Sequence, residues 1–156
     1  MNRRIGFAVA VIAGIGILTV SGAVRQTAPS SPRRAINLPD ANPQAPFSGA
    51  ILAGNTLYLS GHIGVDAKTG VVPTDVDEEI KLLLDHDKAM LAQAGMSMDD
   101  LVYVQIACTD LSLYDKFNAK YRSYFTAKDL PAREFIGVST LLRGGHFELQ
   151  AIAVRH

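Results

Sequence analysis

Along the last two thirds of the chain, the spacing of apolar residues switches between the period of a strand and the period of a helix. This pattern restricts the fold more than any other feature of the sequence. Apolar runs at 51–60, 101–109 and 147–154 are typical of strands, whose successive side chains point to opposite faces. Between them, 76–94 and 112–124 place apolar residues three and four positions apart, as a helix that buries one side requires. The order predicts an α+β fold in which two helices pack on one face of a mixed β-sheet.

Turn and capping residues mark the predicted hairpin and the two ends of the first predicted helix. Gly54 and Asn55 separate two strand-like runs and tolerate positive φ, so they predict a β-hairpin. Gly95 is a typical residue to end the first helix. Two capping pairs compete for the start of that helix: Thr74 with Asp77, and Asp75 with Glu78.

The second helix has its own signals. Ser112 with Asp115 forms a capping pair at its start, and Pro131 is expected to stop it. The run before it, Leu101–Thr109, is apolar and β-branched enough for a buried strand. Cys108 shares the apolar side of this run, and no base lies near it in sequence to activate it, so we interpret it as a core residue.

The first residues differ in composition from the rest. Met1–Arg4 is basic, residues 5–20 are apolar without a charge, and Ser21–Ala23 supplies the small residues of a cleavage site. We therefore expect a signal peptide over residues 1–23 and a periplasmic or secreted mature protein without a stable membrane anchor. The rival interpretation is an uncleaved anchor, because the apolar run is close to the length that spans a bilayer.

Residues 24–34 are polar and rich in proline and serine, which predicts a flexible leader before a single folded domain over residues 35–156. Removal of Arg3 and Arg4 from the 15 basic residues would leave 13 against 15 acidic ones, a formal charge of −2. That charge offers no basic stripe to a nucleic-acid backbone, so no nucleic-acid partner is expected. The histidines lack metal-ligand spacing and the sequence has no phosphate-binding glycine loop, so we expect no metal site and no cofactor.

Arg133 follows a Pro-Ala break at the start of a strand-like segment. A guanidinium keeps its charge and binds a carboxylate through two parallel N–H bonds. The position therefore indicates a site for a small anionic ligand. The alternative is a structural ion pair with Glu134 or Glu148, although Glu134, as the adjacent strand residue, points to the opposite face of the sheet.

Five fragments in sequence order resemble the RidA/YjgF (Rid) family, and together they extend over most of the folded domain. The last fragment is Pro131-Ala132-Arg133 with the strand that follows it, where Glu-Leu-Gln-Ala-Ile-Ala stands in place of the family's Glu-Ile-Glu-Ala-Ile-Ala. The other four lie at 35–40, 45–48, 54–61 and 117–125. The resemblance implies a chorismate-mutase-like (RidA-like) subunit that assembles as a homotrimer, with small-molecule clefts between subunits.

Family members of the best-known type hydrolyse reactive 2-imino or 2-enamino acids to 2-oxo acids and ammonia. In them an Arg holds the substrate carboxylate, while a Glu and a backbone carbonyl position the attacking water. By resemblance, Arg133 is the carboxylate anchor, and Ser60 and Asn118 are polar lining residues. Three substitutions stand at the remaining site positions: Phe47 for Tyr, Phe135 for Cys and Gln150 for the catalytic Glu.

The substitution at Gln150 separates two functional hypotheses. Gln can hydrogen-bond a water but cannot take its proton, and loss of a general base costs about 10² to 10⁴ in rate. The first hypothesis is an exported deaminase-like hydrolase with a degenerate site, in which His62 is an alternative base. The second is a non-catalytic homotrimer that binds a small imine, enamine or 2-oxo acid or acts through its surface. In both, Phe47 and Phe135 have packing as an alternative role.

Overall fold

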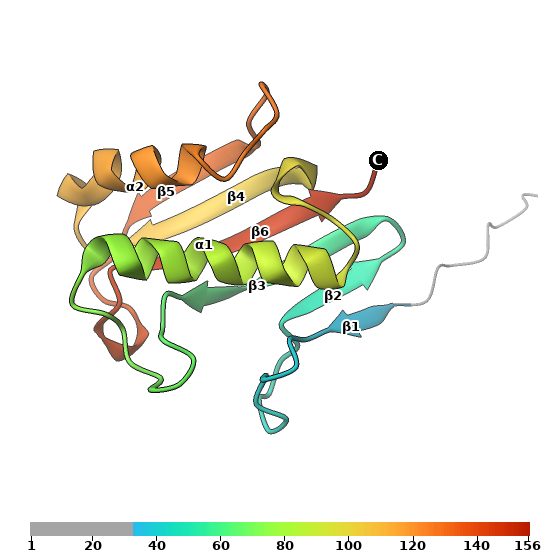
Figure 1. Ribbon diagram of the computed structural model, residues 1–156, viewed down its shortest axis with the longest axis horizontal. Helices are drawn as coiled ribbons and strands as arrows, with labels where there is room; N and C mark the ends of the chain where they lie inside the picture. Colours follow the sequence, from blue (N-terminus) through green and yellow to red (C-terminus); the bar gives the residue numbers. More distant parts are fainter. Residues whose placement is uncertain (1–32) are drawn as a thin grey trace, which may run out of the picture.

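The computed structural model describes residues 33–156, which form one mixed sheet covered on one face by two helices (Figure 1). The strand order is β1-β2-β3-β6-β4-β5, and all neighbours are antiparallel except β4 and β5. The strands are β1 Arg34–Ile36, β2 Ala50–Ala53, β3 Thr56–Ile63, β4 Leu101–Cys108, β5 Ala132–Gly137 and β6 Phe147–Val154. This architecture confirms the predicted fold class.

The predicted signal peptide over residues 1–23 and nearly all of the predicted leader over residues 24–34 lie outside the described residues. The first described strand begins at Arg34, beside the expected start of the domain at residue 35. Among residues 33–156, no helix has the length and apolar character needed to cross a membrane.

Helix α1, Val76–Gln93, begins and ends where the sequence indicated. Of the two predicted caps, Asp75 is the one in place, because its Oδ1 accepts a hydrogen bond from the Asp77 N–H at 2.9 Å. Gly95 ends the helix with φ at 71°, a left-handed conformation that costs glycine little. Local capping chemistry therefore fixes both ends of this helix.

Helix α2, Tyr114–Arg122, corrects two predictions. A 3₁₀ turn at Leu111–Leu113 precedes it, and Asp110 caps this turn, since its Oδ1 accepts from the Ser112 N–H at 2.9 Å. Leu113, not Ser112, is the N-cap residue of α2, and it makes no side-chain capping bond. The helix also ends well before Pro131. The backbone N–H groups of Thr126 and Ala127 each donate to Asp99 Oδ1 at 3.0 Å, which holds the following segment as a loop.

The core lies between the two helices and the sheet. Its side chains come from alternate strand positions and from the inner faces of the helices, as burial of one sheet face requires. The largest fully buried apolar residues are Leu57, Ile80, Leu83, Leu84, Met90, Leu91, Val104, Ile106, Phe117, Phe147 and Leu149. Cys108 is also fully buried, which confirms its interpretation as a core residue, and burial raises the pKa of its thiol.

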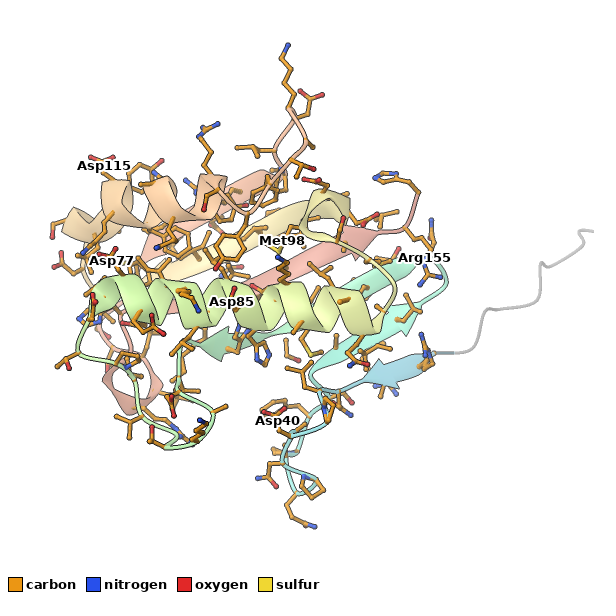
Figure 2. The ribbon with its side chains drawn as sticks, in the orientation of Figure 1. Asp40, Asp77, Asp85, Met98, Asp115 and Arg155 are labelled. Atoms are coloured by element: carbon orange, nitrogen blue, oxygen red, sulfur yellow. The ribbon has the colours of Figure 1, made fainter. Side chains whose placement is uncertain are left out.

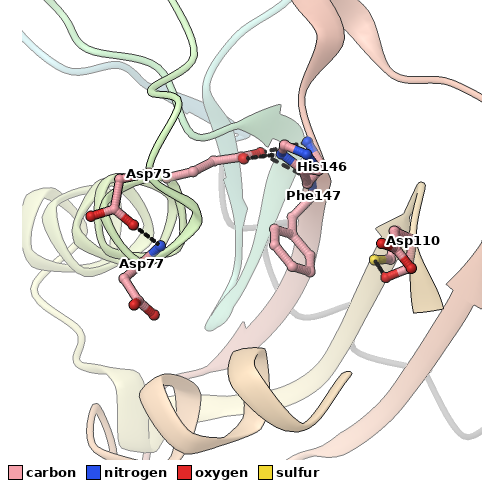
Figure 3. Close-up of polar contacts among 7 residues, drawn as sticks. Asp75, Asp77, Asp110, His146 and Phe147 are labelled. Carbon is pink, nitrogen blue, oxygen red and sulfur yellow. Dashed lines mark hydrogen bonds and ion pairs between the residues drawn. The ribbon is translucent and has the colours of Figure 1, made fainter. Parts of the chain in front are cut away.

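A fully buried carboxylate connects α1 to the segment that enters β6. Glu79 accepts from the backbone N–H of His146 at 2.6 Å and of Phe147 at 3.1 Å, and its Oε2 lies 2.7 Å from His146 Nδ1. Figure 3 shows His146 and Phe147 with these contacts drawn as dashed lines. Gly64 lies so close that a Cβ there would be 2.2 Å from the Glu79 backbone oxygen. The hydrogen bonds from His146 and Phe147 to Glu79 thus fix where β6 starts.

Candidate functional site

The described residues form two hollows that contain predicted site residues. The smaller one, about 300 Å³, lies between α2 and the start of β5, and we call it the Arg133 pocket after one of the two arginines, Arg122 and Arg133, that line it. The larger one, about 910 Å³, lies along β3 and the loop between β1 and β2, and we call it the Glu148 cavity. Asp40, labelled in Figure 2, lies in that loop and contributes to the wall of the cavity.

Arg133 is held by three aromatic rings. Its guanidinium carbon lies 5.1 Å from the centre of the Tyr121 ring and 5.6 Å from the centres of the Tyr114 and Phe135 rings. Such contacts attract a cation and restrict the long side chain to one arrangement. The guanidinium also lies in the wall of the Arg133 pocket, so its charge is ordered before a ligand arrives.

The pairing register of β5 with β4 explains why Arg133 and Phe135 face the helices. Arg133 and Phe135 pair with Val104 and Ile106 of β4, two buried residues on the helix-covered face of the sheet. Asn118 on α2 lines the same pocket, so three of the predicted site residues share one location. Glu134 faces the other way and accepts a hydrogen bond from the Tyr103 hydroxyl at 3.2 Å. It is therefore not the partner of Arg133.

The Glu148 cavity contains the other predicted residues of the site except Gln150. Ser60 and Phe47 line it together with Gly61 and Glu148. The register of β3 with β2 ends at Leu59, and the Ser60 N–H still donates to the Gly49 carbonyl at 2.9 Å, so the free strand edge along which the cavity runs begins after Ser60. The Ser60 hydroxyl donates to the Ser48 carbonyl at 2.7 Å, and Phe47 is 66% exposed.

Glu148 lies close against β3 at this edge. It pairs with Ile63, and a Cβ built on Gly61 would lie 2.5 Å from Glu148 Oε1. Only glycine at position 61 leaves room for this carboxylate without a shift. The side chain is half-buried and lines the cavity, where its oxygens are available as hydrogen-bond acceptors.

Gln150 lies apart from both hollows. It is exposed on the face of the sheet that the helices leave uncovered, and its Nε2 donates to Gln105 Oε1 at 3.4 Å. It shares this face with Glu148, because residues two apart on a strand point the same way. Of the two positions in the Glu-Leu-Gln sequence, the structure thus brings the acid, not the amide, to Ser60 and Phe47.

A polar cluster of His62, His86 and Asp87 includes part of the cavity wall, since both histidines line the cavity and Asp87 is fully buried. His62 lies 3.1 Å from the Leu83 carbonyl through Nε2, and its ring stacks at 4.0 Å on His86. Burial lowers the pKa of both rings, that of His86 to about 4, so neutral imidazoles are favoured. Asp87 Oδ1 lies 3.8 Å from His62 Nε2. Neither carboxyl oxygen of Asp87 has a hydrogen-bond partner among residues 33–156, and burial raises the pKa of Asp87 well above its usual value.

Sequence reasoning did not identify Tyr114, Tyr121 or Glu148 as site residues. The two tyrosines are one helical turn before and after Asn118, near enough in spacing to share its face, but only the position of β5 shows that this face meets Arg133. Within the described chain, no three His, Cys, Asp or Glu side chains gather in a way that would hold a metal ion.

Comparison with known proteins identifies the family to which this sequence and fold are similar. The profile of a family described as Endoribonuclease L-PSP matches residues 38–155. The 2-iminobutanoate/2-iminopropanoate deaminase of Escherichia coli K12 is 36% identical over 112 residues, which cover 70% of this chain and 88% of the relative.

Two solved structures from E. coli have the same fold. That of the YjgF gene product superposes with a TM-score of 0.72 at 33% identity, over 79% of this chain and 99% of the other. That of TdcF with bound serine superposes with a TM-score of 0.73 at 29% identity, over 79% and 99% of the two chains. The fold, the profile match and these relatives together show that this chain belongs to the Endoribonuclease L-PSP family, the RidA/YjgF family that its motifs resemble.

Proposed function

We propose that the protein hydrolyses reactive 2-imino or 2-enamino acids, or related small carboxylates, to 2-oxo acids and ammonia. The deaminase of E. coli that it resembles bears the name of this activity. In this chain, the ordered guanidinium of Arg133 offers a receptor for the carboxylate that all such substrates share.

The observation that carries the proposal is the presence of Glu148 in the cavity with Ser60 and Phe47. A carboxylate can accept the proton of an attacking water, which Gln150 cannot do. We therefore assign the acid–base role to Glu148 in place of Gln150, whose amide supports a neighbouring strand through Gln105. With this assignment the site retains both an anchor and a base.

The proposed reaction needs no acid–base group other than Glu148. Glu148 takes a proton from water as the water oxygen adds to the imine carbon, and the C=N electron pair moves to nitrogen, which then receives that proton. Glu148 next takes the hydroxyl proton of the adduct and passes it to nitrogen. The C–N bond breaks, ammonia leaves and the carbonyl of the 2-oxo acid forms. Throughout, Arg133 holds the carboxylate and fixes which face of the carbon meets the water.

The two halves of the proposed site point to opposite faces of one sheet. Arg133 lies on the helix-covered face, whereas Glu148 of β6 is on the other face, beside the end of β3. We propose that they meet between subunits of a homotrimer, with the Arg133 pocket of one subunit against the Glu148 cavity of the next. Light scattering of the mature domain would give three times the subunit mass, and a monomer at all concentrations would contradict this arrangement.

Ammonia release from a 2-imino acid, generated in place by an amino-acid oxidase, tests the activity. The wild type should exceed the uncatalysed rate, and Arg133→Ala should lose about 10- to 100-fold in kcat/KM, since charge-assisted hydrogen bonds contribute about 1.5 to 3 kcal/mol. Arg133→Lys keeps the charge without the two-pronged geometry and should recover only part of the loss. A wild type at the uncatalysed rate would reject the proposal.

The second candidate function is non-catalytic binding of a small carboxylate. Phe47 favours it, because an exposed phenyl ring at the cavity supplies neither a donor nor an acceptor. The TdcF neighbour was solved with serine bound, which shows that a relative of this fold holds a small amino acid. Binding of 2-oxobutanoate by a wild type that releases no ammonia above background would select this function.

We also propose that the protein is exported and cleaved after Ala23, on the strength of its basic start, apolar run and small residues. Intact-mass measurement of protein from the periplasm or the medium would then find a mature chain that begins at or near Val24. A full-length mass in a membrane fraction would favour the anchor instead.

A further inference from the structure

Tyr114 lies beside the predicted anchor and had no role assigned by the sequence. Its hydroxyl lies 3.3 Å from Arg133 Nη2, and both side chains line the Arg133 pocket. The ring meets Phe135 edge to face, with centres 5.0 Å apart at 84°, which fixes its direction. At 43% exposure the tyrosine is open to solvent on the pocket side.

The direction of the hydrogen bond decides what this hydroxyl can do. Arginine has only donors, so Arg133 donates and the Tyr114 oxygen accepts. The hydroxyl hydrogen of Tyr114 is then free, and no acceptor for it is found among residues 33–156. A tyrosine that accepts from a cation is also a stronger donor, because hydrogen bonds in a chain polarise one another. The pocket therefore presents a further donor next to the guanidinium.

The number of donors exceeds what a simple carboxylate uses. The guanidinium of Arg133 matches both oxygens of a carboxylate through two parallel N–H bonds. The hydroxyl of Tyr114 remains for a third acceptor close to that carboxylate. A 2-oxo acid carries such an acceptor on the adjacent carbon, and a 2-imino acid carries a nitrogen lone pair there. A saturated carboxylic acid carries none.

We propose that Tyr114 is a specificity residue, which donates a hydrogen bond to the atom on carbon 2 of the ligand and so selects 2-oxo and 2-imino acids over simple carboxylates. This inference rests on the proposed function only for the identity of the ligand class. It requires binding in the Arg133 pocket and does not require turnover.

Calorimetric titration of the full protein with 2-oxobutanoate and with butanoate tests the inference. The two probes have the same charge and chain length and differ at carbon 2. The wild type should bind 2-oxobutanoate about ten-fold or more tightly than butanoate, as one hydrogen bond in a charged setting provides. In Tyr114→Phe the ratio should fall to about two or less, with the affinity for butanoate nearly unchanged, because only the hydroxyl is removed.

Tyr124→Phe is the matched control. It also deletes a tyrosine hydroxyl that faces a charged partner, Asp85 at 2.9 Å, but it lies outside both hollows. The control should keep the wild-type ratio. An unchanged ratio in Tyr114→Phe, or a wild type that does not distinguish the two probes, would overturn the inference. If the ratio behaves as expected while no variant releases ammonia, the specificity role stands and the proposed deaminase activity falls.

Discussion

The Arg133 pocket and the Glu148 cavity differ in how their walls are made. The pocket is small, about 300 Å³, and its charged group is stacked among rings from α2 and β5, which are elements of the folded core. The cavity is about three times larger, at about 910 Å³, and is bounded by a long loop and by the end of β3 that β2 leaves unpaired.

The difference indicates which half of the proposed site is preorganised. A guanidinium fixed by aromatic contacts loses little conformational freedom when it binds a carboxylate. The carboxylate of Glu148 instead faces a wide space, and a small substrate fills little of it. We infer that a neighbouring subunit completes this half and brings the anchor with it. The predictions below test the two halves separately, from the largest expected effect to the smallest.

The largest effect is expected at the acid. Glu148→Gln removes the proton acceptor and keeps the shape, so ammonia release should fall by about 10² to 10⁴ with little change in binding of 2-oxobutanoate. Gln150→Ala is the control on the same face of the same strand, and its rate should stay within about two-fold of wild type. The opposite ranking of the two variants would return the acid–base position to residue 150.

The next effect is a loss of stability at Glu79, whose hydrogen bonds hold the start of β6 next to Glu148. Glu79→Ala would leave the backbone N–H groups of His146 and Phe147 without their acceptor, and each unsatisfied group costs about 1 to 3 kcal/mol. The free energy of unfolding in urea should drop by about 2 to 6 kcal/mol. Glu78→Ala, at the exposed neighbouring position, should change it by under about 1 kcal/mol. A similar loss in both would show that Glu79 contributes only helix-end charge.

The smallest effect is a pH-dependent change in stability at Asp87. Burial raises the pKa of Asp87 in the folded state above its unfolded value, so this group stabilises the fold fully below the unfolded pKa. That contribution is lost as the pH rises toward the folded pKa. Asp87→Asn keeps the shape without the charge, so the variant should gain stability over wild type as the pH rises above about 4, and level off above the folded pKa. A stability difference that is constant between pH 4 and 7 would contradict the buried, protonated carboxyl.

Local signals were sufficient to predict the hairpin and α1. Gly54 and Gly95, at φ values of 66° and 71°, lie where a left-handed residue ends one element, and such residues can be read from the sequence alone. The end of α2 could not be read in this way. The loop after it is held by Asp99, which is distant in sequence from Thr126 and Ala127 and meets them only in the folded chain.

The site was predictable in part for a similar reason. The Pro-Ala-Arg break before a strand, together with the family resemblance, predicts Arg133 as a carboxylate anchor, and the guanidinium lies in the wall of a pocket. The choice between Glu148 and Gln150 cannot be made from alternation, because both positions have the same strand parity. The proposed assignment to Glu148 rests on contacts across the sheet, since Glu148 Oε1 lies against Gly61 of β3, whereas the Gln150 amide donates to Gln105 of β4.

Subunit complementation tests most directly the central claim, that the anchor and the acid of one site come from two subunits. Arg133→Ala and Glu148→Gln, each nearly inactive alone, would be co-expressed in equal amounts with different affinity tags, and mixed assemblies would be purified. In every mixed trimer one of the three interfaces carries both wild-type residues, so ammonia release should recover to about a third of the wild-type rate. Mixed assemblies no more active than the separate variants would contradict the claim and place both groups within a single chain.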